Sequence, residues 1–530
     1  MTRKESGILL VILAVFVAHA VYLQCVAEDA FITFRFARHL VNGHGLVWNI
    51  GEPPVEGYTN FLWLLLCALA LKLQWNVALT SQILGVASGI GAILCTYGYA
   101  RRWLALPGWC AWIPCAFLAL SGPFAAWAGS GLETSLFGFL LVAGAYWYVG
   151  YHRSGSSRHL ALACGLLLLA TLTRPEGLLV FGWLGALSLL SSPWSTKRLG
   201  ELAIAGAVYL IPVALYCVWR HEYFGYWLPN TFYAKTGGRF FQYLRGAKYS
   251  GLFFGYFVLP LLLPLLPGLG KPPGRPKSLG REGRAARMGL WTCWTVLALY
   301  TLYIVYVGGD YMAMFRFFVP LLPFLYLLFG ALLHRLWETR VARKTRRSLA
   351  AGCLILAAAV TVAFSTPLEA RLLPKPRFMH GCYRGILIER WHSARLQLIG
   401  RFFHDYKQGP KESLAVEPIG AVSYYADMPV HSISAIVDPH IAHQTKRRSG
   451  KAFGKGLPGH EKVDFQYVLA KNPTYILYLK PERYLTPEPR PLILEGPAGS
   501  RYRSVSVWLK DAVNGEEGYL SFLELKGARR

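Results

Sequence analysis

The sequence is poor in charged residues, and acids are the scarcer sign. Charged residues make up 16% of the 530 positions, and 28 Asp and Glu stand against 55 Lys and Arg, while hydrophobic residues reach 54%. Soluble domains carry about 25% charged residues. The apolar residues are also gathered in runs of roughly 14 to 23 residues rather than spread periodically. This composition excludes a soluble enzyme and indicates a multi-pass membrane protein.

The chain has neither a cysteine framework nor an internal repeat. Its 10 cysteines lie nearly all inside the apolar runs, and the expected soluble tail has only Cys382. A disulfide scaffold and a zinc site are therefore not indicated. Asp438, His440, His443 and His460 in the tail lack a Cys or a local Glu ligand, which favours acceptor binding or domain packing over a metal. We expect no metal, divalent or otherwise, and no other cofactor.

The net charge of +27 reflects membrane topology rather than binding to nucleic acid. Basic residues are concentrated in short loops between apolar runs: Arg101 and Arg102, Arg153 and Arg158, Lys197 and Arg198, residues 271–287 and residues 338–347. The first run follows Arg3 and Lys4 and is too long for a cleaved signal, so we expect an uncleaved anchor with the N-terminus in the cytoplasm. These loops then also face the cytoplasm.

The apolar runs predict about eleven transmembrane helices. They lie near 7–26, 78–100, 109–128, 132–150, 159–172, 177–193, 199–219, 250–268, 289–307, 317–336 and 349–365. A further run, 58–73, is ambiguous, and the basic loops share one side only if it lies at the interface or re-enters. We expect a transmembrane module over residues 1–365 and an extracytoplasmic α/β domain over 366–530, with strands within 412–426 and 474–480.

This topology brings most of the unusual polar sequence to the outer face. It comprises residues 27–77, 129–135, 173–177, 220–240, 308–317 and the tail. Glu28 and Asp29 come directly after the first span and before an expected interfacial helix that stops at Asn42 and Gly43. The two acids could complement the start of that helix, or one could serve as a general base at the interface.

Several motifs resemble a known family. They are "EDAFITFRFARHLVNGHGLVWN", "VEGYTNFLW", "GLET", "TRPEG", "LPNTFYAK" and, in the tail, "GAVSYYADMPVHSISAIVDPHIAH" with "PGHEK". Together they resemble the GT-C glycosyltransferases that use polyprenyl-phosphate sugars, and most closely the terminal β-(1→2)-arabinofuranosyltransferase family of actinobacterial cell-wall synthesis and its bacterial relatives. Such families usually place Asp first in the acid pair. Here Glu28 takes that position, so either acid could be the base, and Asp29 is favoured because it keeps the residue type.

The resemblance implies roles for further residues. A phosphate leaving group needs cations at the outer face, which gives Lys235, Arg174, Arg316 and Arg220 as candidates, against the alternative of solvated cations. Arg174 stands in "TRPEG", where Thr173 and Glu176 could instead form a capping box. The candidate substrate-binding residues, which could also be caps, charge partners or interfacial aromatics, are Glu56, Tyr58, Asn60, Glu133, Glu176, Asn230, Asp310 and His460.

The sequence therefore favours a membrane glycosyltransferase in the bacterial cytoplasmic membrane. The resemblance implies transfer of D-arabinofuranose from a polyprenyl phosphate to a glycan, lipid or protein acceptor on the outer face, with membrane lipids as surroundings. The alternative is a transporter or flippase for a lipid-linked glycan, which predicts repeats and charges near helix midpoints.

Overall fold

We analysed a computed structural model of the chain. It describes residues 3–191, 195–236, 239–259 and 281–338, scattered residues between 351 and 362, and then 383–444, 460–477, 485–494, 499–511, 515 and 517–528. Residues 271–280, 339–347 and 366–382, which include parts of two expected basic loops, the expected domain boundary and Cys382, lie outside the described residues. Residues 281–287, expected as loop, instead begin a helix.

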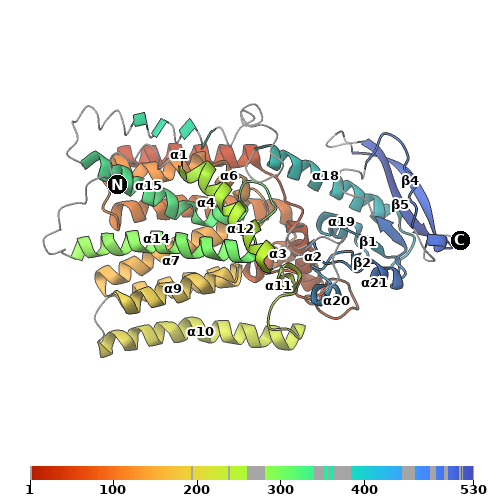
Figure 1. The fold of residues 1–530 in the computed structure, drawn as a ribbon, viewed down its shortest axis with the longest axis horizontal. Helices are drawn as coiled ribbons and strands as arrows, with labels where there is room; N and C mark the ends of the chain where they lie inside the picture. The colour runs from red at the N-terminus through yellow and green to blue at the C-terminus, as the bar shows by residue number, and fades with distance from the viewer. Residues whose placement is uncertain are drawn as a thin grey trace.

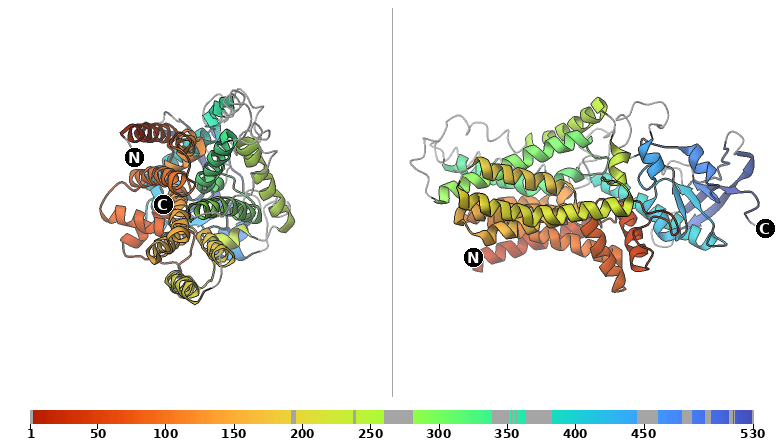
Figure 2. Two further views of the ribbon diagram at one scale, coloured as in Figure 1. Left: turned by 90° about the vertical axis from the view of Figure 1, so that its left-hand side faces the viewer. Right: turned by 90° about the horizontal axis from the view of Figure 1, so that it is seen from below.

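The described residues between 3 and 338 form a helical bundle whose long helices run along the long axis of the molecule (Figure 1). Its main helices are α1 (Arg3–Leu23), α4 (Val77–Arg102), α5 (Gly108–Leu120), α6 (Gly122–Ala128), α7 (Thr134–Ser154), α8 (Ser157–Thr173), α9 (Glu176–Leu190), α10 (Thr196–Phe224), α12 (Arg239–Phe253), α14 (Arg281–Val307) and α15 (Leu322–Glu338). The π-turn η1 (Phe254–Val258) follows α12, and the 3-10 turn η3 (Arg316–Leu321) precedes α15. Viewed end-on, the long helices stand side by side (Figure 2).

Within the described residues, five helices are long and apolar enough to cross a membrane, or six if a bent pair counts as one span. They are Glu5–Leu23, Val77–Arg102, Thr196–Phe224, Gly283–Val307 and Arg316–Glu338. The bent pair is α5 and α6, which meet at 60°, and Pro123 near the start of α6 fits a break there. Helices occupy the other expected segments that the structure describes, while the total of eleven spans stays a prediction.

Two short helices lie at the end of the bundle that faces the C-terminal domain (Figure 1): α2 (Ala30–Val41) and α3 (Phe61–Lys72). α2 ends at Val41, followed by Asn42 as the C-cap and Gly43 with φ of 82°, as the Asn-Gly stop predicts. α3 has 12 residues, which span about 18 Å against a hydrocarbon core of about 30 Å. The run 58–73 is therefore too short as a helix to cross a membrane, in agreement with the interfacial or re-entrant interpretation.

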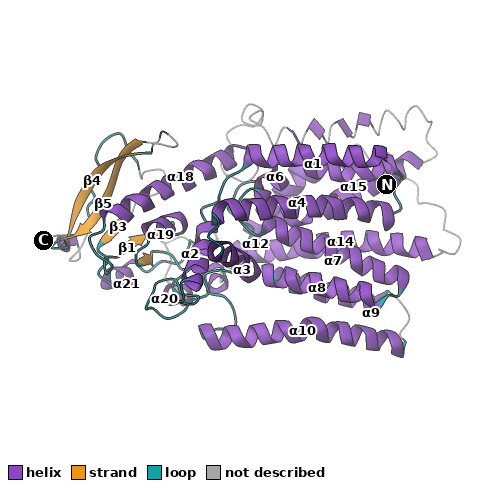
Figure 3. Cartoon of the chain, turned by 180° about the vertical axis from the view of Figure 1, so that it is seen from behind, coloured by secondary structure: helices purple, strands orange, loops and turns teal. Residues whose placement is uncertain are grey.

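The C-terminal domain is built on a mixed sheet of five strands in the order β2-β1-β3-β5-β4. The strands are β1 (Leu414–Val416), β2 (Val430–Ser432), β3 (Tyr475–Leu477), β4 (Tyr502–Lys510) and β5 (Glu517–Leu525), with β1 parallel to β2 and β3, and β5 antiparallel to β3 and β4. Its helices are α18 (Tyr383–Tyr406), α19 (Gly420–Ala426), α20 (Pro439–His443) and α21 (Phe465–Ala470). Among the described residues strands occur only here (Figure 3), so the α/β character of the tail is confirmed. The strand expectation for residues 412–426 is wrong in its second half, because α19 occupies Gly420–Ala426.

The C-terminal domain packs directly on α2 through one buried arginine. Arg35 is 2% exposed, and its guanidinium donates to the carbonyl oxygens of Ser423 (2.5 Å) and Met428 (3.0 Å) and, from Nε, to that of Trp48 (2.9 Å). Phe31 on α2 packs against Tyr424, with ring centroids 5.7 Å apart. A buried guanidinium that loses its acceptors leaves an uncompensated charge, so these contacts fix the position of α2 relative to the tail.

Candidate functional site

The candidate site lies where the loops between helices meet the C-terminal domain. Asp29 and Asp310 lie on either side of Arg316, which opens η3. Arg316 binds Asp310 through two bonds, Nε to Oδ2 at 2.7 Å and Nη2 to Oδ1 at 3.2 Å, and its Nη1 lies 3.6 Å from Oδ2 of Asp29. Tyr311 donates from its hydroxyl to Oδ1 of Asp29 at 3.5 Å. Asp29 thus has only long contacts, while Asp310 holds the arginine tightly.

Glu28 and Asp29 have different surroundings although they are adjacent. Asp29 occupies the N-cap position of α2, but its side chain makes no capping hydrogen bond, and it is 25% exposed. Glu28 is 6% exposed, and its Oε1 accepts from the backbone N–H of Gly420, the first residue of α19. One interpretation of the pair was that the acids complement the start of the helix that follows them. Glu28 does lie at a helix start, but the helix is α19 of the C-terminal domain rather than α2.

The environment of Glu28 disfavours its charged form. Burial, followed by the neighbouring carboxylates of Asp29 and Glu389, raises the pKa of Glu28 well above its usual value. Glu389, on α18, accepts from the backbone N–H of Glu28 at 3.1 Å, and burial raises its pKa to about 7. A neutral carboxyl cannot act as a general base, so the geometry separates the partly exposed Asp29 from the buried Glu28.

Arg174 connects two acids from different helices. Its Nη1 lies 2.7 Å from Oε1 of Glu133 and its Nη2 lies 2.9 Å from Oε1 of Glu176. Asn60 also donates to Glu133, at 2.9 Å. The expected capping box is wrong: Pro175 is the N-cap of α9, Glu176 is engaged by Arg174, and the hydroxyl of Thr173 donates back into α8. Each predicted site residue here is thus a charge partner.

Lys235 differs from the other candidate cations. It ends the short helix α11 (Asn230–Lys235), whose first residue donates to the carbonyl oxygens of Ala435 and Ile436 at 2.8 and 2.9 Å. Burial, and secondarily the charge of Arg316, lowers the pKa of Lys235. Its ammonium makes no hydrogen bond or ion pair with the part of the chain that the structure describes. An ammonium that lines two cavities and has no bound carboxylate in that part of the chain is suited to an anionic ligand.

Two adjacent cavities meet at Lys235. The acid cavity is lined by Asp29, Ile32, Thr33, Gly57, Tyr58, Thr59, Asn60, Leu132, Glu133, Arg174, Thr231, Lys235, Arg316, Phe317 and Ile436. The aromatic cavity shares Thr59, Arg174, Thr231, Lys235 and Phe317 with it and is completed by Pro175, Glu176, Leu228, Pro229, Phe232, Thr236, Tyr303, Val307, Gly309, Asp310 and Tyr311. Buried Nε of Arg174 and Oγ1 of Thr231 have no hydrogen-bond partner among the described residues. Unsatisfied polar atoms beside a cavity are available to a ligand.

Five predicted site residues line neither of these cavities: Glu28, Glu56, Arg220, Asn230 and His460. Arg220 binds Glu56 through Nε at 3.0 Å and Nη2 at 2.7 Å, and both are buried, which makes them a structural ion pair. Asn230 holds α11 on the tail, as described above. His460 lies 2.8 Å from Glu417 through Nδ1 and packs edge-on against Tyr311.

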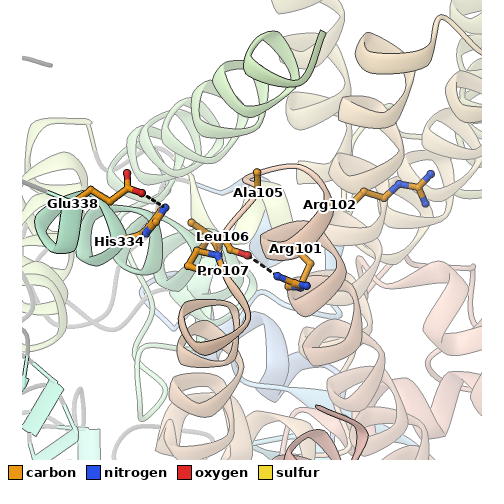
Figure 4. A pocket seen from close by; sticks show the side chains of 7 residues that line it. All are labelled: Arg101, Arg102, Ala105, Leu106, Pro107, His334 and Glu338. Carbon is orange, nitrogen blue, oxygen red and sulfur yellow. Dashed lines mark hydrogen bonds and ion pairs between the residues drawn. The ribbon is translucent and has the colours of Figure 1, made fainter. Parts of the chain in front are cut away.

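Another pocket lies near the N-terminal end of α1, and Figure 4 shows the side chains that line it. It is lined by Arg101, Arg102, Ala105, Leu106, Pro107, His334 and Glu338. His334 and Glu338 lie 3.5 Å apart, Arg101 donates to the carbonyl oxygen of Leu106, and Arg101 also lies 3.8 Å from Glu5 of α1. The contact with α1 places this pocket beside the N-terminus, away from the acids and Lys235. Two of its lining residues, Arg101 and Arg102, belong to a predicted basic loop, and none is a predicted site residue.

The structure adds two residues to the site that sequence reasoning missed. Tyr311 follows Asp310 directly, so its proximity to that acid could have been anticipated. Glu389 could not, because it lies 361 residues from Glu28 on a helix with an ordinary amphipathic pattern. Within the described residues, no group of three or more His, Cys, Asp or Glu side chains could hold a metal ion.

Comparisons with known proteins address the fold. Residues 386–522 match a family model described as a domain of unknown function, DUF8728. The crystal structure of ArnT from Cupriavidus metallidurans bound to undecaprenyl phosphate superposes with a TM-score of 0.54 over 99% of this chain and 98% of that chain, at 12% identity. Its apo form gives the same values. The chain has the GT-C fold. The resemblance inferred from the motifs is therefore confirmed at the level of fold.

One curated relative matches in sequence. The terminal β-(1→2)-arabinofuranosyltransferase of Mycobacterium tuberculosis is 27% identical over 265 residues, which is 46% of this chain and 40% of the relative. The match thus spans less than half of either protein. It supports a distant relationship and leaves the activity of the whole chain to be proposed.

Proposed function

We propose that this protein is an integral-membrane glycosyltransferase that takes a sugar from a polyprenyl phosphate. One observation carries the proposal: Asp29 and Lys235 line the same cavity, and Lys235 has no anionic partner among the described residues. A base and an unpaired cation are the two groups that transfer from a lipid phosphate requires. The GT-C fold and the undecaprenyl phosphate bound to ArnT support this assignment.

In this mechanism Asp29 is the general base. Its carboxylate takes the proton from an acceptor hydroxyl while the acceptor oxygen attacks the anomeric carbon of the donor sugar. The bond between that carbon and the phosphate oxygen breaks, and its electron pair leaves with the lipid phosphate. Arg316 orients Asp29 from 3.6 Å, and this distance leaves the carboxylate free to accept a proton.

The departing phosphate is held by Lys235, with Arg174 as a second contact. Arg174 already binds Glu133 and Glu176, so its unpartnered Nε is the atom that remains for the phosphate. Arg316 is bound to Asp310, and Arg220 is bound to Glu56. These two arginines therefore position the acids rather than the phosphate. Lys235 lies at the junction of the cavities, which puts the sugar in the acid cavity and the lipid chain along the aromatic cavity. The proposal assigns no metal.

The proposed sugar is D-arabinofuranose, and the acceptor is an envelope glycan, lipid or protein on the outer face of the bacterial cytoplasmic membrane. The mycobacterial relative supports the sugar. The candidate sugar-contacting residues are Asn60, Glu133 and Thr231, with Tyr58 and Glu176 at the cavity margins. In this topology residues 1–365 form the membrane module, and the tail from 366 is periplasmic.

The experiment is a transfer assay with purified full-length protein. Synthetic polyprenyl-phosphate pentoses and hexoses are incubated with a panel of envelope glycan fragments, and products are identified by mass spectrometry. We expect pentosylated product with wild type and with Asp405→Asn, an exposed acid on α18, and none with Asp29→Asn. Full turnover by Asp29→Asn, or transfer from no lipid-phosphate sugar, contradicts the proposal.

A further inference from the structure

Glu389 anchors the segment that carries Asp29. Its Oε1 accepts from the backbone N–H of Glu28 at 3.1 Å, and Glu28 directly precedes Asp29. The contact joins α18 of the C-terminal domain to the loop that leaves the first apolar helix. The neighbouring Arg390 reinforces it, because its guanidinium donates to the carbonyl oxygens of Tyr22 and Gln24 at the end of that helix. The acid loop is therefore held from the tail at two adjacent points.

The anchoring group is ionisable and stands among other acids. A backbone N–H could be satisfied equally well by a carbonyl or an amide oxygen. The charged and titratable groups that face Glu389 are Cys25, Glu28, Asp29, Asp310, Tyr311 and Arg316. Only Arg316 among these carries positive charge, and it is already bound to Asp310. A carboxylate at this position therefore repels Asp29. A residue that only held the backbone in place would not need this charge.

We propose that Glu389 is a positioning residue for Asp29, which fixes the backbone of the acid loop and, when ionised, favours the arrival of a proton at Asp29. The inference rests on the proposed function, in which Asp29 is the base. Repulsion between the two carboxylates is relieved when Asp29 takes the proton of the acceptor, so the ionised form of Glu389 assists the step. Glu389 itself touches neither substrate nor cavity wall.

The role predicts a particular dependence on pH. Burial raises the pKa of Glu389 to about 7. Below this value its carboxyl is neutral and gives no electrostatic assistance; above it, the charge is present. Glu389→Gln keeps an oxygen that can accept from the N–H of Glu28, and it removes the charge at every pH. The variant should therefore behave like the wild type at low pH and fall behind as the pH rises.

The test compares kcat/KM of wild type and Glu389→Gln across the pH range, with Asp405→Asn as the matched control. Asp405 is an exposed acid on the same helix, about 24 Å further along its axis. We expect the ratio of wild type to Glu389→Gln to be near one at about pH 5.5 and about tenfold at about pH 8.5. The ratio for Asp405→Asn should stay near one throughout.

The outcomes separate this inference from the proposed function. A ratio for Glu389→Gln that is constant with pH, whatever its size, means that the residue is only a structural anchor and overturns the inference. Should Glu389→Gln unfold, Glu389→Asp answers the same question, because it keeps the charge and should keep the wild-type pH profile at a reduced kcat. Asp29→Asn is assayed in parallel. If this variant retains turnover, the proposed function fails. If it loses turnover while the ratio for Glu389→Gln does not change with pH, the inference fails and the proposed function stands.

Discussion

Glu28 and Asp29 are adjacent in sequence, yet their carboxyl groups serve different parts of the molecule. The carboxyl of Glu28 accepts from the first N–H of α19 in the C-terminal domain, while that of Asp29 lines the acid cavity beside Arg316. This division of roles has consequences that can be measured separately.

We expect Glu28→Gln to fold and to retain turnover within about tenfold of wild type, because burial raises the pKa of Glu28 and so favours its neutral form, which an amide resembles. Glu28→Ala should be less stable by about 1–3 kcal/mol, since the N–H of Gly420 loses a buried acceptor. Thermal unfolding and turnover of both variants provide the check. If Glu28→Gln lost as much turnover as Asp29→Asn, the assignment of Asp29 rather than Glu28 as the base would be contradicted.

Lys235→Ala should weaken use of the donor about 10-fold to 100-fold, which corresponds to a charge-assisted contact of about 1.5–3 kcal/mol. KM for the acceptor should change little. The comparison is made with Lys72→Ala, which removes an exposed lysine at the end of α3. Equal effects of Lys235→Ala on donor and acceptor would argue against phosphate binding.

Arg220→Met should destabilise the protein rather than impair donor binding. Arg220 and Glu56 are 7% and 4% exposed and are joined by two hydrogen bonds, and removing one partner of a buried pair costs about 3–5 kcal/mol. We expect a lower Tm with an unchanged KM for the donor in the protein that remains folded. The double change Arg220→Met with Glu56→Leu should recover part of the stability. A selective rise in donor KM with normal Tm would restore Arg220 to the donor site.

The stability of the protein should fall between about pH 5 and pH 8 through Glu389. Burial raises its pKa from the ordinary value of 4.5 to about 7 on folding, so the folded state holds a proton that the unfolded state has released in this range. The stability linked to that proton is complete below about pH 4.5 and is lost as the pH rises through about 7, a change of about 1–3 kcal/mol. Glu389→Gln should therefore gain in Tm over wild type as the pH is raised. A difference in Tm that is independent of pH would contradict the shift.

The sequence predicted those features that depend on local pattern. Apolar runs located the helices, and the Asn42-Gly43 pair located the end of α2. The placement of the basic loops favoured an interfacial or re-entrant run at 58–73, where α3 has 12 residues. The acids and cations of five loops were also expected on one face, and the ion pairs Arg174–Glu133, Arg220–Glu56 and Arg316–Asp29 join those loops.

Pairing between distant residues could not be predicted. The sequence offered Arg220, Arg174, Arg316 and Lys235 as candidate cations and favoured Lys235 through its motif, but charge alone does not reveal which of them meets a carboxylate. Only the three-dimensional structure distinguishes the partnered arginines from Lys235. Likewise, no local signal marks Glu389, because its partner is a backbone N–H from the other end of the chain.

The contacts of Arg35 bear on how such proteins can be recombined. Its guanidinium donates hydrogen bonds to the backbone oxygens of Ser423 and Met428. The positions of these oxygens depend on the path of the chain rather than on side-chain identity. A tail taken from another GT-C protein would have to reproduce this path to within hydrogen-bond distance, or leave a buried cation unsatisfied. Chimeras that exchange residues 27–60 together with the tail should thus fold and insert more readily than chimeras that exchange the tail alone.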